Sequence, residues 1–256
     1  MGTVPVEATV PKAQKTERRF ADRDRLFYVI AAVMMLIFTA GGFRRFYLHG
    51  KAPWGELTHQ IFPLVVIHGI AMSSWVVVFF VQSVLILRGY RRLHMMVIGW
   101  VGAALVPVIV ILGSVGGVLS ARFRPEIYAP LGGPRAFLAT MLMEMACFGT
   151  FAAIGLANRR RPEIHRPMML LASLSMISGA IGRFPYVEPF AFRPPLYVMG
   201  PALVFGAFLF LLQWAMTRAA NRRYLMGFAG ITIASVLAAA IGTSAVWNHM
   251  VATLVP

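Results

Sequence analysis

Apolar stretches of about 20 residues recur along this chain and alternate with short polar segments. A helix needs about 20 apolar residues to cross a bilayer, so the pattern predicts transmembrane helices. The fifth stretch is short and carries Arg183 near its end, where the arginine is expected to reach toward the membrane interface. The whole pattern predicts an all-α polytopic bundle of seven transmembrane helices, at residues 26–43, 61–87, 95–119, 136–157, 167–184, 195–216 and 225–247.

The composition supports a membrane protein and leaves no room for a large soluble domain. Of the 256 residues, 59% are hydrophobic and 13% are charged, whereas soluble domains are about half apolar and a quarter charged. Residues 1–25 mix acids and bases and lack an apolar core, so they predict a polar cytoplasmic tail, disordered until about Arg18, rather than a signal peptide. Residues 26–256 then form a single transmembrane domain.

The basic residues predict the orientation in the membrane. The N-terminal tail and the even-numbered loops hold 16 Lys and Arg residues, and the odd-numbered loops hold 8. Short loops rich in Lys and Arg stay cytoplasmic, so we expect a cytoplasmic N-terminus, an external C-terminus and a bacterial-type inner membrane. Because the net charge of +15 is banded at the membrane boundaries, the expected partners are anionic lipid headgroups and not nucleic acid. The single cysteine, Cys147, excludes an intrachain disulfide.

Two ionisable residues, His68 and Glu144, lie within apolar stretches and are the first candidates for catalytic roles. Ionisable groups inside a membrane are costly and commonly functional. Both predicted helices run inward, and both groups lie on the order of 10 Å below the outer boundary at the rise of an α-helix. The pair would meet if the two helices are neighbours. The structural alternative is that Glu144 pins the bundle by pairing with His68 or Arg183.

Small and polar residues predict how the second and third helices pack. His68, Trp75 and Gln82 recur every seven residues, which places them on one stripe expected to face the bundle interior. Gly113 and Gly117 are spaced to let another helix approach closely.

Two further histidines, His94 and His165, each stand at the inner start of a helix among arginines. One interpretation is that they contact lipid phosphates. The alternative is that both ligate a metal or a haem iron, with Arg92 and Arg166 near the cofactor and able to pair with haem propionates.

The positions of His68, His94, Glu144 and His165 on four consecutive helices resemble the transmembrane ascorbate-dependent cytochrome b family. In that family, four histidines on four consecutive helices hold two haems. The resemblance implies that His94 and His165 hold the inner haem, while Glu144 stands where the outer haem would need the partner of His68.

A second resemblance is to a group of uncharacterised bacterial multi-pass membrane proteins, and it spans the second to fifth helices. It implies a shared fold and shared inner histidines without an established activity. The residues that carry it are His68-Gly69, Trp75, Gln82, His94 with Gly99, the run from His165 to Ala172, and Arg183-Phe184-Pro185.

Three functions remain open at this point. The first is a membrane redox protein that binds one haem b or a quinone, with His68 and Glu144 exchanging protons with the quinone oxygens. The second is a non-catalytic accessory subunit bound to other membrane subunits. The third is a small proton-coupled transporter in which Glu144 is the coupling group.

Overall fold

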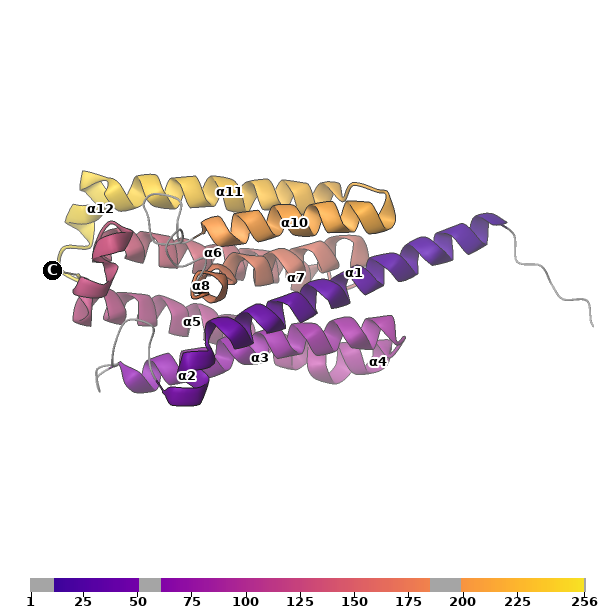
Figure 1. Ribbon diagram of the computed structural model, residues 1–256, viewed down its shortest axis with the longest axis horizontal. Coiled ribbons are helices and arrows are strands. Elements are labelled where there is room, and N and C mark those ends of the chain that lie inside the picture. Colours follow the sequence, from indigo (N-terminus) through magenta and orange to yellow (C-terminus); the bar gives the residue numbers. More distant parts are fainter. Residues whose placement is uncertain (1–11, 51–60, 185–198, 256) are drawn as a thin grey trace, which may run out of the picture.

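The computed structural model describes residues 12–50, 61–184 and 199–255, which form helices joined by short turns and contain no strand (Figure 1). Within these residues, six helices or helical runs are long and apolar enough to cross a membrane, so the protein is a multi-pass membrane protein. Residues 51–60 and 185–198, which hold most of the loops after the first and fifth predicted helices, lie outside the described residues. The six are α1 (Lys12–Gly42), α3 (Phe62–Leu87), the run α4 (Arg91–Leu93), η1 (His94–Ile98) and α5 (Gly99–Phe123), α6 (Pro134–Ala157), α10 (Gly200–Thr217) and α11 (Arg222–Thr243).

The predicted fifth crossing takes the form of two shorter helices. They are α7 (Pro162–Met176) and α8 (Ser178–Ile181), and the helix is interrupted between them at Ile177. From Pro167 to Met176, α7 is buried at every residue except Met169. Its 15 residues span about 22 Å at the α-helical rise, which explains why it does not count among the six long spans. Seven crossings therefore remain a prediction.

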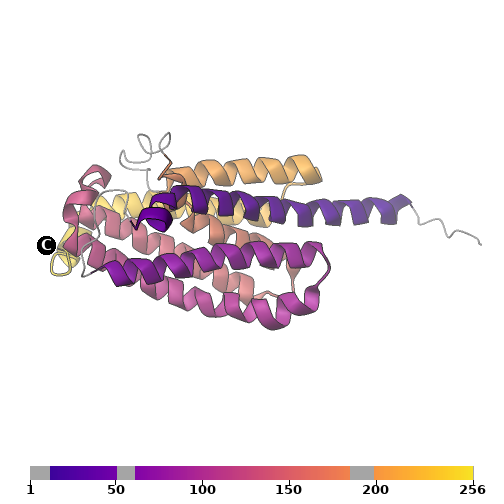
Figure 2. The same cartoon turned by 60° about the horizontal axis from the view of Figure 1, so that its bottom comes forward.

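The helices lie roughly parallel, and polar segments gather at the two ends of the bundle (Figures 1 and 2). One end, which we call the arginine end, carries α4 and the turns that contain Arg159–Arg161 and Arg218–Arg223. The start of α1 lies at this end, and the C-terminus lies at the other. The opposite end is capped by α2 (Arg44–His49), the 3-10 helix η2 (Pro125–Leu131) and α12 (Ala245–Met250).

Two predicted boundaries are wrong. Helix α1 begins at Lys12 and not near Leu26. The segment before Arg18 was expected to be disordered, but it is helical from Lys12 onward. The Ala, Lys, Gln, Glu and Arg residues of this segment are good helix formers. Helix α11 ends at Thr243, and Ser244 then caps α12 by accepting a 3.2 Å hydrogen bond from the Trp247 amide. His249 lies in α12, beyond the end of α11.

Close helix packing at the predicted glycines is confirmed. A Cβ at Gly113 would lie 2.2 Å from Met145 Sδ, and one at Gly117 would lie 2.8 Å from Met141 Cγ. Both methionines belong to α6, so these glycines allow α5 and α6 to approach each other. Gly42 serves α1 in the same way, because a Cβ there would lie 2.1 Å from the Ala180 carbonyl oxygen.

Candidate functional site

A cavity of about 290 Å³ lies among α1, α3, α5, α6 and the break between α7 and α8, toward the end opposite the arginine end. Ligand pockets commonly measure about 300–1,000 Å³, so this one suits a ligand the size of a ring. Apolar, aromatic and thioether side chains predominate in its wall, and they include Phe43, Phe46, Leu64, Met72, Leu112, Phe137, Met141, Met145 and Ile177.

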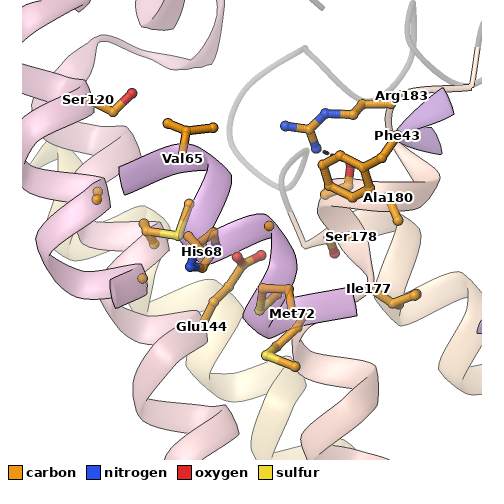
Figure 3. Close-up of a pocket in the computed structure, with 18 of the residues that line it drawn as sticks. Phe43, Val65, His68, Met72, Ser120, Glu144, Ile177, Ser178, Ala180 and Arg183 are labelled. Atoms are coloured by element: carbon orange, nitrogen blue, oxygen red, sulfur yellow. Dashed lines mark hydrogen bonds between the residues drawn. The ribbon is translucent and has the colours of Figure 1, made fainter. Parts of the chain in front are cut away.

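The cavity brings together the two predicted intramembrane groups. His68 from α3 and Glu144 from α6 both line it, and Figure 3 shows the imidazole beside the carboxylate. Glu144 is only 5% exposed. Within the described part of the chain, neither His68 Nδ1 nor Glu144 Oε1 has a hydrogen-bond partner, although both atoms are buried. A buried polar atom left without a partner costs about 1–3 kcal/mol, so these two atoms mark a place where a ligand or water would be stabilising.

Helix α5 packs against His68 and against α6, the helix that carries Glu144. A Cβ at Gly113 would clash with Met145 Sδ and would also lie 3.3 Å from His68 Cε1. The absence of a side chain at Gly113 therefore leaves the space that the imidazole and the thioether occupy.

The break between α7 and α8 forms one wall of the cavity. Met176, Ile177, Ser178 and Gly179 all line it. The Ser178 hydroxyl is buried and has no hydrogen-bond partner among the described residues. Irregular backbone at membrane depth is tolerated where it is buried in protein or lines a polar cavity, and discontinuous helices often build substrate sites in transporters. The sequence signal for this break is the Gly179 and Gly182 pair in an otherwise apolar stretch.

Arg183 lines the cavity. Its guanidinium lies 4.5 Å from the centre of the Phe43 ring and donates a hydrogen bond to the Gly179 carbonyl. The cation–π contact fixes the guanidinium at the cavity wall. The cavity therefore has an imidazole, a carboxyl group and a guanidinium around an otherwise largely apolar space.

Two hydroxyl pairs close the side of the cavity toward α2 and η2. Tyr47 of α2 is hydrogen-bonded to Ser73 of α3, and Tyr128 of η2 is hydrogen-bonded to Ser120 of α5. All four residues line the cavity. Burial raises the pKa of Tyr128 above its ordinary value, so its phenol stays protonated at neutral pH.

The predicted interior stripe on α3 is confirmed. Trp75, 1% exposed, donates a 3.0 Å hydrogen bond from Nε1 to Ser173 Oγ and packs edge-on against Phe148 at a centroid distance of 4.9 Å. Gln82 donates a 3.2 Å hydrogen bond from Nε2 to the His94 carbonyl oxygen. Sequence reasoning missed Ser173, although it lies eight residues after His165 on one stripe of α7.

The other predicted pair, His94 and His165, meets at the arginine end. The ring centres are 6.1 Å apart and the ring planes cross at 81°. His165 Nδ1 lies 2.9 Å from the Gly155 carbonyl oxygen. His94 is the first residue of η1, a π-helical segment, and such segments occur frequently at functional sites.

The two arginines expected near a haem differ in their surroundings. Arg166 is held by Asp24 of α1 at 2.9 Å, and Asp24 also accepts a 3.0 Å hydrogen bond from Gln213. Arg92 is exposed. Arg166 is therefore engaged within the protein and does not fit the role of a propionate partner.

No group of three or more His, Cys, Asp or Glu side chains in the described ranges is placed to hold a metal ion. No family model, curated protein or solved structure matches this chain.

Proposed function

We propose that the cavity binds a small quinone-like molecule, with His68 and Glu144 hydrogen-bonded to its ring oxygens. The observation that carries this proposal is that two buried polar atoms, His68 Nδ1 and Glu144 Oε1, lack partners in the described structure and border the same largely apolar cavity. A neutral imidazole offers one N–H donor and one lone pair, and a carboxyl group donates when protonated and accepts in either form. Together they match both the carbonyl oxygens of a quinone and the hydroxyls of a quinol.

The rest of the wall suits an uncharged ring. Phe43 and Phe46 offer aromatic contacts, and Met72, Met141 and Met145 offer thioethers, which make favourable contacts with ring edges. A volume of about 290 Å³ accommodates a substituted ring and excludes a long isoprenoid tail. We therefore expect a tail, if present, to leave the cavity toward the lipid.

The test is binding of a short-tailed quinone to the protein in lipid nanodiscs, with a variant that fills the cavity. Gly116 lines the cavity, and a Cβ there meets no atom closer than Leu64 Cδ2 at 3.8 Å. Gly116→Leu should therefore fold normally and reduce affinity at least tenfold. The matched control is Val115→Leu, since Val115 is 45% exposed on the same helix. Equal binding by Gly116→Leu and wild type would contradict the proposal.

The polar contacts need their own variants. Glu144→Gln retains the size of the side chain and removes its charge, and His68→Leu removes both ring nitrogens. We expect His68→Leu to weaken binding about tenfold or more, since one unmet hydrogen bond in a buried site costs about 1–3 kcal/mol. Glu144→Gln should have a smaller effect, because an amide still donates and accepts. If this protein bound no quinone but purified with a membrane partner in a fixed ratio, that result would favour the accessory-subunit function.

A second candidate, a proton-coupled transporter, is favoured by the helix break beside Glu144. Met176, Ile177 and Ser178 border the same cavity as this carboxyl group, and transporter sites commonly lie at such breaks. In proteoliposomes this function predicts a pH-dependent flux that Glu144→Ala abolishes. A flux that survives the substitution would remove Glu144 from the coupling role.

For the membrane orientation we propose seven crossings, with α7 and α8 as the fifth and with the arginine end in the cytoplasm. The gathering of arginine-rich turns at one end of the bundle supports this orientation. Ala220 and Thr253 are exposed near opposite ends of the chain's helical bundle, and the native Cys147 is buried. A membrane-impermeant maleimide added to intact cells should label Thr253→Cys but not Ala220→Cys; the reverse pattern would overturn the orientation.

A further inference from the structure

We propose that His94 and His165 form a binding site for a transition-metal ion of the copper(II) and nickel(II) class. The site is separate from the cavity: neither histidine lines the cavity, and Gln82, which is bonded to His94, lies 14 residues after His68 on α3, about 21 Å along a helix. The proposal therefore stands or falls independently of quinone binding.

The hydrogen bond of His165 prepares its ring for coordination. A backbone carbonyl oxygen can only accept, so the 2.9 Å contact with Gly155 places the proton on His165 Nδ1. The lone pair then lies on Nε2, the usual arrangement of a metal-bound histidine whose other nitrogen donates to a carbonyl. On the other ring, His94 Nδ1 is buried and has no hydrogen-bond partner within the described ranges.

The donor set selects the class of ion. Two imidazole nitrogens and the nearby amide oxygen of Gln82 form a mixed nitrogen and oxygen set, and such sets suit copper(II) and nickel(II). Copper(II) also binds nitrogen and oxygen ligands more tightly than the other divalent ions of the first transition row. The ring centres lie 6.1 Å apart, close enough for one ion to contact both imidazoles, because a bound ion lies about 2 Å from each ligating nitrogen.

Neighbouring groups can complete the coordination and balance the charge. Gln82 Oε1 is buried without a partner in the described structure, and its amide is anchored beside His94 through Nε2. An amide oxygen and water suit the remaining positions of such an ion. The positive charge of Arg166 would repel a metal ion, but the Asp24 carboxylate opposes it at 2.9 Å.

The test is titration of the chelator-stripped, full-length protein in detergent with Cu²⁺, followed by electron paramagnetic resonance. We expect one strong site per chain with hyperfine splitting from two nitrogens. His94→Ala and His165→Ala should each weaken binding at least tenfold and remove the two-nitrogen pattern. His49→Ala is the matched control, because His49 is an exposed histidine on α2, and it should leave the spectrum unchanged.

A further measurement separates loss of the site from loss of the fold. The buried Cys147 should stay protected from a maleimide in every variant that is correctly folded. Unchanged copper binding in folded His94→Ala or His165→Ala protein would overturn the proposal, as would loss of binding in His49→Ala. A Soret band in the purified protein that both substitutions abolish would assign the pair to haem iron and overturn the free-ion site.

Discussion

Replacing Gly113 by alanine tests the packing that holds His68 and Met145 in place. The new Cβ would lie 2.2 Å from Met145 Sδ, 3.1 Å from Met145 Cγ and 3.3 Å from His68 Cε1. Because Met145 is only 3% exposed, its side chain cannot move out into lipid. The clash must therefore separate α5 from α6 or push the thioether into the cavity.

A matched variant isolates the cost of this clash. Alanine stabilises a helix by about 1 kcal/mol relative to glycine, and that gain applies equally to Gly116→Ala, three residues further along α5 and without a close contact at its Cβ. Overpacking a core costs about 1–3 kcal/mol. We therefore expect Gly113→Ala to be less stable than Gly116→Ala by about 1–3 kcal/mol, a ratio of roughly 5 to 150 in the unfolding equilibrium constant.

The single cysteine supplies the assay. Cys147 lies on α6, directly in the helix that the clash displaces, and it is buried in the folded protein. A thiol-reactive fluorophore should therefore report unfolding as the detergent-solubilised protein is heated or titrated with SDS. Equal stability of the two alanine variants would refute the reasoning, because it would show that Gly113 is not a point of close approach.

Two further substitutions test interior contacts, the first with the same fluorophore and the second with the copper spectrum. Ser173→Ala removes the partner of Trp75 Nε1 and should cost about 1 kcal/mol, typical of hydrogen bonds between membrane helices. Ser175→Ala should cost less, since that buried hydroxyl donates to the carbonyl oxygen of the nearby Ala172 in its own helix. Equal costs would argue against the Trp75 hydrogen bond. Gly99→Ala would place a Cβ 2.7 Å from the His94 carbonyl oxygen. The substitution should therefore disturb η1 and change the copper spectrum of the histidine pair. An unchanged spectrum would show that η1 does not position His94.

The sequence predicted most long helices, because apolar length and basic flanks determine them directly. The seven-residue spacing of His68, Trp75 and Gln82 also placed an inward stripe on α3 correctly. Equal depth was enough to suggest that His68 and Glu144 meet, although depth alone does not determine which helices are neighbours.

The remaining features depend on contacts between residues distant in the chain. The ion pair of Asp24 with Arg166 joins residues 142 positions apart, and no local pattern indicates it. The π-helical turn at His94 arises where Gln82 holds a carbonyl oxygen from the neighbouring helix. The break at Ile177 could be suspected only from the nearby glycines, and the close approach of Gly42 to Ala180 beside it joins residues far apart in the chain.

The central claim, that the cavity holds a quinone-like ring beside His68 and Glu144, is tested most directly by photolabelling with an azidoquinone in native membranes. The account predicts labels on cavity-lining residues of α3 and α6, near Met72 and Met141, that disappear in Gly116→Leu and with excess unlabelled quinone. The claim would be contradicted if the labels lay only on exposed residues such as Trp100 and Met226 and if Gly116→Leu did not change them.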